Sequence, residues 1–198
     1  MRTVSIEDVC EVITDGTHYT PPDTGEGIPF LTVKDMADLG LDFNNCSRIT
    51  SEEYAKAKTG NSAPRQGDVL FSKDGTVGKV HVVIENQDFA VLSSIAILRP
   101  KKNILDSHYF GRVLCAPTTL NQAIKRKTGS AVRRIILKDL KQVQIPLPPI
   151  AQQRRIADIL DRADAVRRKR KEGIALTEEL LRSAFLEMFG DPVANLVD

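Results

Sequence analysis

Apolar residues in the C-terminal part of the chain recur at steps of three and four, the spacing that places side chains along one face of an α-helix. Pro148 and Pro149 precede this pattern and suit the first turn of a helix, where the backbone N–H that proline lacks has no partner. The pattern predicts one helix of about 40 residues, which would be roughly 60 Å long. Its apolar positions are Ile156, Ile159, Leu160, Ala163, Val166, Ile174, Leu181, Phe185 and Met188.

The apolar stripe of this helix is narrow, and a long helix with such a stripe usually packs along a second helix. The stripe is interrupted at 167–173, where no large apolar residue occurs and Gly173 lowers helix stability. The helix therefore bends there, consists of two helices, or loses contact with its partner over this stretch. The basic side chains of the interruption form either a solvated face or a surface for DNA phosphates or an acidic protein.

The preceding part of the chain alternates short apolar segments with loops rich in glycine, proline and threonine, which predicts an α+β domain. Residues 4–12 fit a short helix or a strand. Thr50 or Ser51 is expected to cap a helix over 50–58. Strands are expected at 28–36, 68–71, 78–83 and 89–98 (the last as one strand or two), and further helices at 107–116 and 119–127.

The composition fits a globular protein, because 198 residues with 41% hydrophobic and 27% charged side chains suffice for one large domain, or for a domain with an appendage. No run of about 18 apolar residues occurs, so we expect no membrane span. The N-terminus lacks the apolar core of a signal peptide. Cys10, Cys46 and Cys115 are odd in number and have no metal-binding spacing, which favours reduced thiols in a cytoplasmic protein.

The net charge of +2 is uninformative, but the charges are unevenly distributed along the chain. Residues 1–60 carry five lysines and arginines against eleven aspartates and glutamates, whereas residues 121–144 carry seven against one. A basic stretch on a nearly neutral chain is typical of a nucleic-acid contact, although an ordinary surface loop has the same composition.

A glycine turn lies between two of the expected strands and has some features of a phosphate-binding loop. Such a loop has four residues between its glycines and a Ser or Thr after its lysine. Gly75 and Gly78 are separated by only two residues, and Val80 follows the lysine, so nucleotide binding is not expected. The turn still lets the backbone approach a partner closely. Its candidates for contact with DNA are Lys73, Thr76 and Lys79.

Basic residues bracket a Thr-Gly-Ser sequence at 128–130, ahead of the long helix. A Gly-Ser loop exposes backbone N–H groups, and flanking cations can hold phosphates or, for arginine, form two hydrogen bonds with guanine in the major groove. A solvated basic loop is the alternative. The candidate contacts are Lys125, Arg126, Lys127, Ser130, Arg133 and Arg134.

Sequence motifs of catalysis are missing. The chain contains no N-P-P-[FY] or D-P-P-Y motif of DNA amino-methyltransferases, no glycine-rich loop for AdoMet and no Walker A motif. G-x-S-x-G and H-E-x-x-H are absent too, and three scattered histidines do not suggest a zinc site. A nuclease carboxylate set has no fixed spacing, and nothing in the sequence favours one. We therefore expect no catalytic residue, metal or cofactor in this chain.

Three segments near the C-terminus resemble a known family. IPLPPIAQQRRIADILDRAD, at 145–164, is similar to the junction between a recognition domain and the conserved helical region in specificity (S) subunits of type I restriction-modification systems. LKDLKQVQ, at 137–144, and LEMFGDP, at 186–192, match the same pattern. Weaker matches extend the resemblance over nearly the whole chain, and the junction is its most specific part.

The resemblance implies roles in DNA recognition for several polar residues. In the family a strand similar to 28–36 carries a polar residue toward the target, which points to Lys34. Glycine turns like that at 73–79 recur in the recognition domains, and a Thr-Gly-Ser loop before a Leu-x-x-Leu strand lies at the DNA face. Thr17 and His18, at the entrance of the first long loop, complete the candidate contacts.

The resemblance also implies an architecture, with a recognition domain at 1–147, a coiled-coil type helical arm at 148–190 and a tail at 191–198. A full-length S subunit looks like two such units in tandem, so this chain is similar to a half subunit. The domain would bind double-stranded DNA at one half of a bipartite target. The arm would form a homodimer and dock the methyltransferase subunits, and through them the restriction subunits. A non-catalytic interaction scaffold is the main alternative, and an enzyme of nucleic-acid metabolism is a second.

Overall fold

The computed structural model describes residues 2–37, 40–125 and 135–190. It consists of a compact unit over residues 1–157 and a second unit over 158–198. The compact unit is built from mixed β-sheets and short helices, and the described part of the second unit is helical, which confirms the expected α+β class with a long C-terminal helix. The compact unit extends past residue 147 because it includes the first turns of that helix.

The central sheet of the compact unit has four antiparallel strands in the order β2-β10-β7-β8. Successive side chains of β10 enter different apolar clusters, because Ala96 and Leu98 face one cluster and Ile95 and Ile97 face the other. Burial on both faces explains why the sequence of this strand is a continuous apolar run. The strands are β2 (Cys10–Asp15), β7 (Val69–Ser72), β8 (Val80–Val82) and β10 (Ile95–Pro100).

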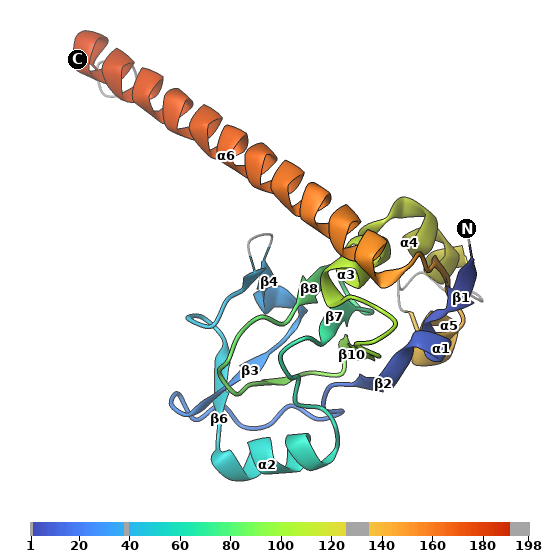
Figure 1. The fold of residues 1–198 in the computed structure, drawn as a ribbon. Coiled ribbons are helices and arrows are strands. Elements are labelled where there is room, and N and C mark those ends of the chain that lie inside the picture. The colour runs from blue at the N-terminus through green and yellow to red at the C-terminus, as the bar shows by residue number, and fades with distance from the viewer. Residues whose placement is uncertain (1, 38–39, 126–134, 191–198) are drawn as a thin grey trace. The chain divides into compact units, whose positions relative to one another are not determined.

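Helices cover one face of the central sheet (Figure 1). Phe110 and Leu114 are almost completely buried in the same cluster as Phe71 and Leu98. On this side a short antiparallel pair, β1 with β11, joins the N-terminus to the segment that precedes the long helix. The elements are β1 (Thr3–Ser5), α1 (Ile6–Val9), α3 (Ser107–Cys115), α4 (Pro117–Lys125), α5 (Leu137–Lys141) and β11 (Gln144–Pro146).

The opposite face packs against a smaller mixed sheet of order β6-β3-β9, because Leu31 and Val91 share the second apolar cluster with the central strands. Thr50 caps the helix beside this sheet by accepting a hydrogen bond from the N–H of Glu53 at 3.2 Å, as expected from the sequence. The elements are β3 (Ile28–Leu31), the 3-10 helix η1 (Val33–Asp35), β4 (Met36–Ala37), β5 (Gly40–Leu41), β6 (Ser47–Ile49), α2 (Ser51–Thr59) and β9 (Ala90–Val91).

Three segments differ from the prediction or refine it. The strand expected at 28–36 ends at Leu31, because Thr32 caps η1 and its N–H bonds the carboxylate of Asp35 at 2.6 Å. Residues 89–98 form two strands, one in each sheet. The Leu-x-x-Leu segment expected as a strand is helix α5, so that prediction is wrong.

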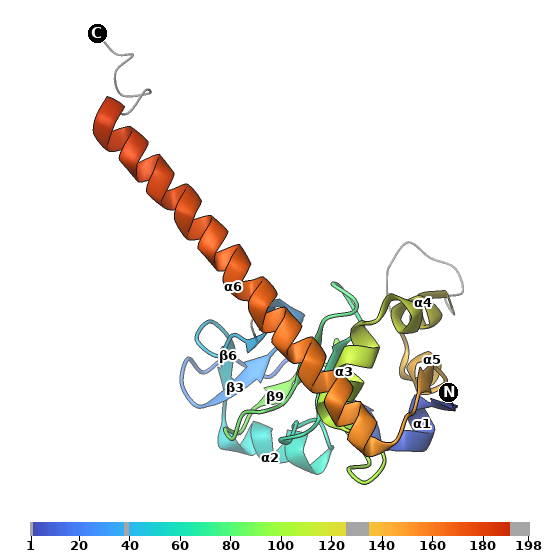
Figure 2. The same cartoon turned by 45° about the horizontal axis from the view of Figure 1, so that its top comes forward.

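Helix α6 (Ile150–Phe189) contains 40 residues in one unbroken run, which Figure 2 shows along its length. Its length agrees with the prediction, and the two prolines lie directly before its first turn, where Pro149 O accepts the N–H groups of Gln152 and Gln153. The helix is not divided at 167–173. Lysine, arginine and glutamate have good helix propensity, and together they outweigh the cost of one glycine.

Candidate nucleic-acid interface

The register of the central sheet brings three loops to one of its ends. Asp15, the last residue of β2, pairs with Ala96, and Ser72, the last residue of β7, pairs with Ile95. Both partners lie at the beginning of β10. The loops that leave these strands, and the 92–94 turn that enters β10, therefore meet at the same end of the sheet.

The glycine turn at this end is fixed by the hydroxyl of Ser72, which donates to Thr76 O at 2.6 Å and accepts from the N–H of Lys79 at 2.7 Å. Gly75 and Gly78 have φ values of 66° and 98°, a region that other residues rarely adopt. The exposed tip of the turn is formed by Gly75 and Thr76. The turn thus presents a defined backbone and one hydroxyl to solvent.

The two lysines that flank the turn point into the domain. Lys73 is only 2% exposed, and its Nζ lies 3.3 Å from Asp15 Oδ1. Lys79 is half-buried, and its Nζ donates to the carbonyl oxygens of Val33 and Met36. The burial of Lys73 contradicts the prediction that it contacts DNA directly, because burial beside a carboxylate leaves its ammonium no access to a phosphate. Lys79 joins the turn to η1 through these hydrogen bonds, and its contact with DNA stays a prediction.

Other predicted contacts have different surroundings. Thr17 is buried and its hydroxyl donates to Tyr19 O at 2.9 Å, so it shapes the loop rather than facing solvent. His18 and Thr76 are exposed. Lys34 is exposed as well, on the 3-10 helix that Lys79 contacts.

The basic segment that the sequence singled out is only partly described. Lys125 ends α4, and its side chain lies outside the described part. The described chain resumes at Ile135, whose N–H donates to Lys73 O at 2.7 Å, which places Ile135 at the same end of the sheet. The residues outside the described part are Arg126, Lys127, Ser130, Arg133 and Arg134.

The sequence analysis missed Asp15 and Ser72, two polar residues that organise this region. Each is the last residue of a strand of the central sheet, and Ser72 comes directly after the buried apolar run at 69–71, which is a recognisable signal for a residue at a sheet end. The partner of Asp15 could not be inferred, because β2, which Asp15 ends, and β7, which Lys73 follows, are not neighbours in the sheet.

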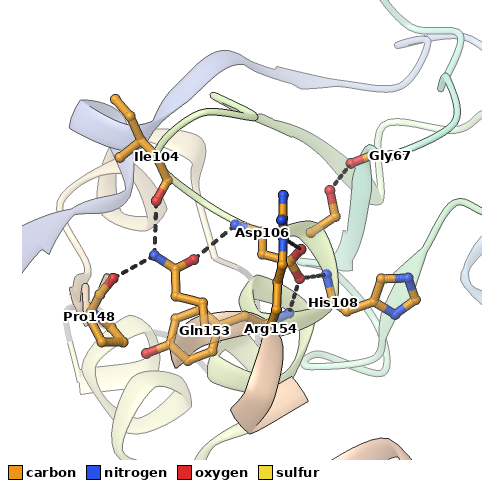
Figure 3. A network of polar contacts seen from close by, with 9 residues as sticks. Gly67, Ile104, Asp106, His108, Pro148, Gln153 and Arg154 are labelled. Atoms are coloured by element: carbon orange, nitrogen blue, oxygen red, sulfur yellow. Dashed lines mark hydrogen bonds and ion pairs between the residues drawn. The ribbon is translucent and has the colours of Figure 1, made fainter. Parts of the chain in front are cut away.

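A second polar network lies at the beginning of α6, within the compact unit (Figure 3). The Gln153 side chain is fully buried and forms three hydrogen bonds with backbone groups, two as donor and one as acceptor. Asp106 caps α3 through the N–H groups of His108 and Tyr109, and its carboxylate lies 3.6 Å from Nε of Arg154. The helical arm therefore begins at a well-fixed point of the domain.

The second unit exposes the apolar stripe that the sequence predicts. Ile159 is 55% exposed, Ile174 61% and Leu181 66%, and the described residues of this unit contain no buried side chain. Ile156 and Ala157, by contrast, pack against the core of the compact unit. An exposed apolar stripe of this length on a helix is typical of a contact with another helix.

The described residues contain neither a metal-binding cluster nor a membrane-spanning helix. No group of three or more His, Cys, Asp and Glu side chains in this part of the chain could hold a metal ion. None of the described helices combines the length and the apolar character needed to cross a membrane. All three cysteines are described, and none forms a disulfide.

Comparison with known proteins identifies the family. The type I restriction modification DNA specificity domain matches residues 1–176. The chain belongs to this family. Among specificity subunits, it is 26% identical to the EcoBI subunit of Escherichia coli over 174 residues, which are 82% of this chain and 36% of that protein. The MjaIX subunit of Methanocaldococcus jannaschii is 24% identical over 190 residues, which are 94% of this chain and 43% of that protein.

Solved specificity-subunit structures agree with this assignment. A chain from a study of complex assembly and conformational transition of the type I R-M system matches with a TM-score of 0.67 and 29% identity, over 92% of this chain and 43% of that one. The HsdS subunit from Thermoanaerobacter tengcongensis matches with a TM-score of 0.58 and 21% identity, over 96% of this chain and 50% of that one, and supports the fold alone. This specificity chain therefore spans half or less of the length of these relatives.

Proposed function

We propose that this specificity subunit recognises one half of a bipartite DNA target through residues 1–147 and pairs with its partners through the arm at 148–190. The observation that carries the proposal is the meeting of loops from distant strands at one end of the central sheet, where Ile135, the first described residue after the basic segment, also lies. The chain itself would be non-catalytic and cytoplasmic. Methyltransferase and restriction subunits would supply AdoMet, methyl transfer, ATP hydrolysis and cleavage.

Charge and exposure at this end of the sheet support contact with DNA. His18, Lys34 and Thr76 are exposed, and a Cβ at Gly75, at the tip of the glycine turn, would meet no other atom within 4 Å, so the backbone there is open to a partner. The segment between Lys125 and Ile135 adds several cations. Contacts of cations with phosphates fix the position on the duplex, whereas side chains in the grooves contact base edges. Because phosphate contacts dominate affinity, binding would weaken steeply with salt.

The exposed stripe of α6 supports a homodimer through the arm. Pairing of two antiparallel arms relates the two recognition domains by a two-fold axis, and the target is then an interrupted palindrome. The charges favour the antiparallel orientation, since the basic run 167–171 and the acidic pair Glu178 and Glu179 lie on either side of Gly173. Antiparallel pairing brings each basic run to the acidic pair of the second copy, whereas parallel pairing would place like charges together.

The surface of the paired arms that faces away from the seam would dock the methyltransferase subunits, and through them the restriction subunits. A solved relative comes from a study of complex assembly in a type I R-M system, which supports this assignment. The test of this step is co-purification of the chain with a co-expressed methyltransferase subunit of a type I system from the same organism. Absence of a complex when the arm is intact would contradict it.

DNA recognition can be tested with the purified chain and a random duplex library. We expect rounds of selection to enrich an interrupted palindrome, and affinity for the enriched pool to fall strongly between about 50 and 200 mM salt. Light scattering over a dilution series gives the oligomeric state in the same buffers. Failure to enrich any sequence, or an affinity that does not change with salt, would overturn the DNA-binding proposal.

An interaction scaffold without DNA recognition is the competing proposal, because the exposed arm supports it equally well. The double substitution Arg133→Ala/Arg134→Ala separates the two. Loss of sequence-selective DNA binding with unchanged protein partners supports recognition. A scaffold predicts that neither property changes.

A further inference from the structure

A buried ion pair connects two strand ends beneath the proposed DNA-binding surface. Lys73 follows β7 and Asp15 ends β2, and β10 lies between these strands. Nζ of Lys73 is 3.3 Å from Oδ1 of Asp15, and the two side chains are only 2% and 12% exposed. The buried pair therefore links the ends of β2 and β7 across the beginning of β10.

The backbone of Lys73 joins two more segments to this point. Its N–H donates to Ser94 O at 2.9 Å, in the turn that enters β10. Its carbonyl accepts the N–H of Ile135 at 2.7 Å, where the chain returns from the basic segment. A single residue thus contacts three of the chain segments that carry or flank the candidate DNA contacts.

The chain on the Asp15 side is held equally closely. A Cβ at Gly16 would lie 2.1 Å from Val91 O, so only glycine allows the backbone to pass here. The N–H of Thr17 donates to Val91 O at 2.9 Å, and Thr17 O accepts the N–H of Ser93 at 2.9 Å. Residues 16 and 17, which directly follow Asp15, are therefore fixed against the 91–93 segment, and the exposed His18 comes next in the chain.

Stability alone does not account for this arrangement. Two charges removed from water recover little net energy from each other, and an apolar pair of similar volume often stabilises a protein as well or better. A buried ion pair does, however, restrict its partners to one geometry. We infer that Lys73 and Asp15 are positioning residues, which hold residues 16–18, the glycine turn and the chain at Ile135 in the arrangement that distinguishes DNA sequences. The inference rests on the proposed function.

Replacing both charged side chains with neutral ones distinguishes an effect on loop position from an effect on the stability of the fold. Lys73→Met alone leaves the Asp15 carboxylate buried without its ammonium and is expected to lower the unfolding midpoint. Asp15→Asn/Lys73→Met removes both charges and is expected to recover most of that loss. The control is Lys34→Met, which removes an exposed lysine. The probes are the duplex pool enriched by the wild-type chain and the unselected random pool.

We expect the double variant, although folded, to lose about tenfold in preference for the enriched pool, the equivalent of one base contact. Its affinity for the random pool should stay close to that of the wild type. Lys34→Met should weaken binding to both pools alike. A double variant that keeps the wild-type preference would overturn the inference, whereas a wild-type chain that enriches nothing would overturn the proposed function and this inference with it.

Amide hydrogen exchange provides a readout without DNA. In the double variant, exchange should become faster at 16–18, 73–79 and 92–95 and remain unchanged in α2. A double variant that loses its preference for the enriched pool but shows unchanged exchange at those segments would contradict the positioning role. The loss of preference would then not result from a changed loop arrangement.

Discussion

The side-chain oxygen of Gln153, in the first turns of α6, accepts the backbone N–H of Asp106 at 2.9 Å. The amide nitrogen of the same side chain donates to Ile104 O at 2.9 Å and to Pro148 O at 2.8 Å. Asp106 is itself the N-cap of α3. One fully buried amide therefore connects the beginning of the arm, the beginning of α3 and the loop before it (Figure 3).

Gln153→Leu should destabilise the compact unit by about 3 kcal/mol, because the N–H of Asp106 and the carbonyl groups of Ile104 and Pro148 lose their hydrogen-bond partner in a buried or partly buried site. Urea unfolding gives the change in the free energy of unfolding. Gln152→Leu is the matched control, since Gln152 is exposed on the same turn and should change stability by less than about 0.5 kcal/mol. Equal effects of the two substitutions would show that the network does not hold the helix.

The three cysteines should react with iodoacetamide in a fixed order. Burial raises the pKa of the Cys10 thiol to about 12 and also raises the pKa of Cys46, whereas Cys115 is exposed. Since the thiolate is the nucleophile, we expect Cys115 to react first and Cys10 only on unfolding. Peptide mass spectrometry over a time course at pH 8 measures this order. Rapid alkylation of Cys10 in the folded chain would contradict it, and the unfolded chain serves as the control with similar rates at all three sites.

Acid should loosen the first long loop before it unfolds the core. Hydrogen bonds from the N–H groups of Arg48 and Gly25, both 3.0 Å long, hold the pKa of Asp23 below its usual value of 3.8. A carboxyl whose pKa is lower in the folded state contributes stability above its unfolded pKa and loses it as the pH falls through the folded pKa. The contribution of Asp23 is therefore complete above about pH 5 and disappears on acidification below about pH 4.

An NMR titration of the Asp23 carboxyl carbon tests this directly, and Asp23→Asn should remove its share of the pH dependence of unfolding. A midpoint at or above 3.8 would contradict the proposed hydrogen-bonding effect. Glu26 is a control in the same loop, and Glu26→Gln should leave this acid dependence in place.

The sequence was sufficient for elements whose pattern is local. The steps of three and four over Ile156 to Met188 predicted a helix that the structure contains as one run, and Thr50 gave the start of α2. The alternating burial of β10 appeared in the sequence only as an apolar run, because both faces of the strand are covered.

The sequence did not predict features that depend on contacts between residues far apart in the chain. Lys73 looked like a surface cation beside a glycine turn, since nothing near it in the sequence reveals that Asp15 comes to lie against it. Leu137 and Leu140 are three residues apart, a spacing that suits one helical turn and not a strand, and Leu140 is buried in the helical layer. Local pattern thus predicted most elements, but not the inward direction of side chains at the proposed interface.

The exposed stripe of α6 leads to a test with a closely matched control. Ile174 and Leu176 are 61% and 60% exposed in the same stretch of helix. Because each residue turns the helix by about 100°, these two side chains point about 200° apart around its axis. Ile174 continues the predicted seam and Leu176 does not. Ile174→Glu should therefore raise the dissociation constant of the homodimer by about tenfold or more, because antiparallel pairing would bury the new carboxylate in an apolar seam.

Leu176→Glu should leave the association unchanged, and neither substitution should alter the stability of the compact unit, since both side chains lie in the second unit. Sedimentation equilibrium over a dilution series measures the dissociation constants. Equal weakening by both variants would show that the arm associates through another face. A wild-type chain that remains monomeric at every concentration would reject self-pairing, and the seam would then belong to a contact with a different helical partner.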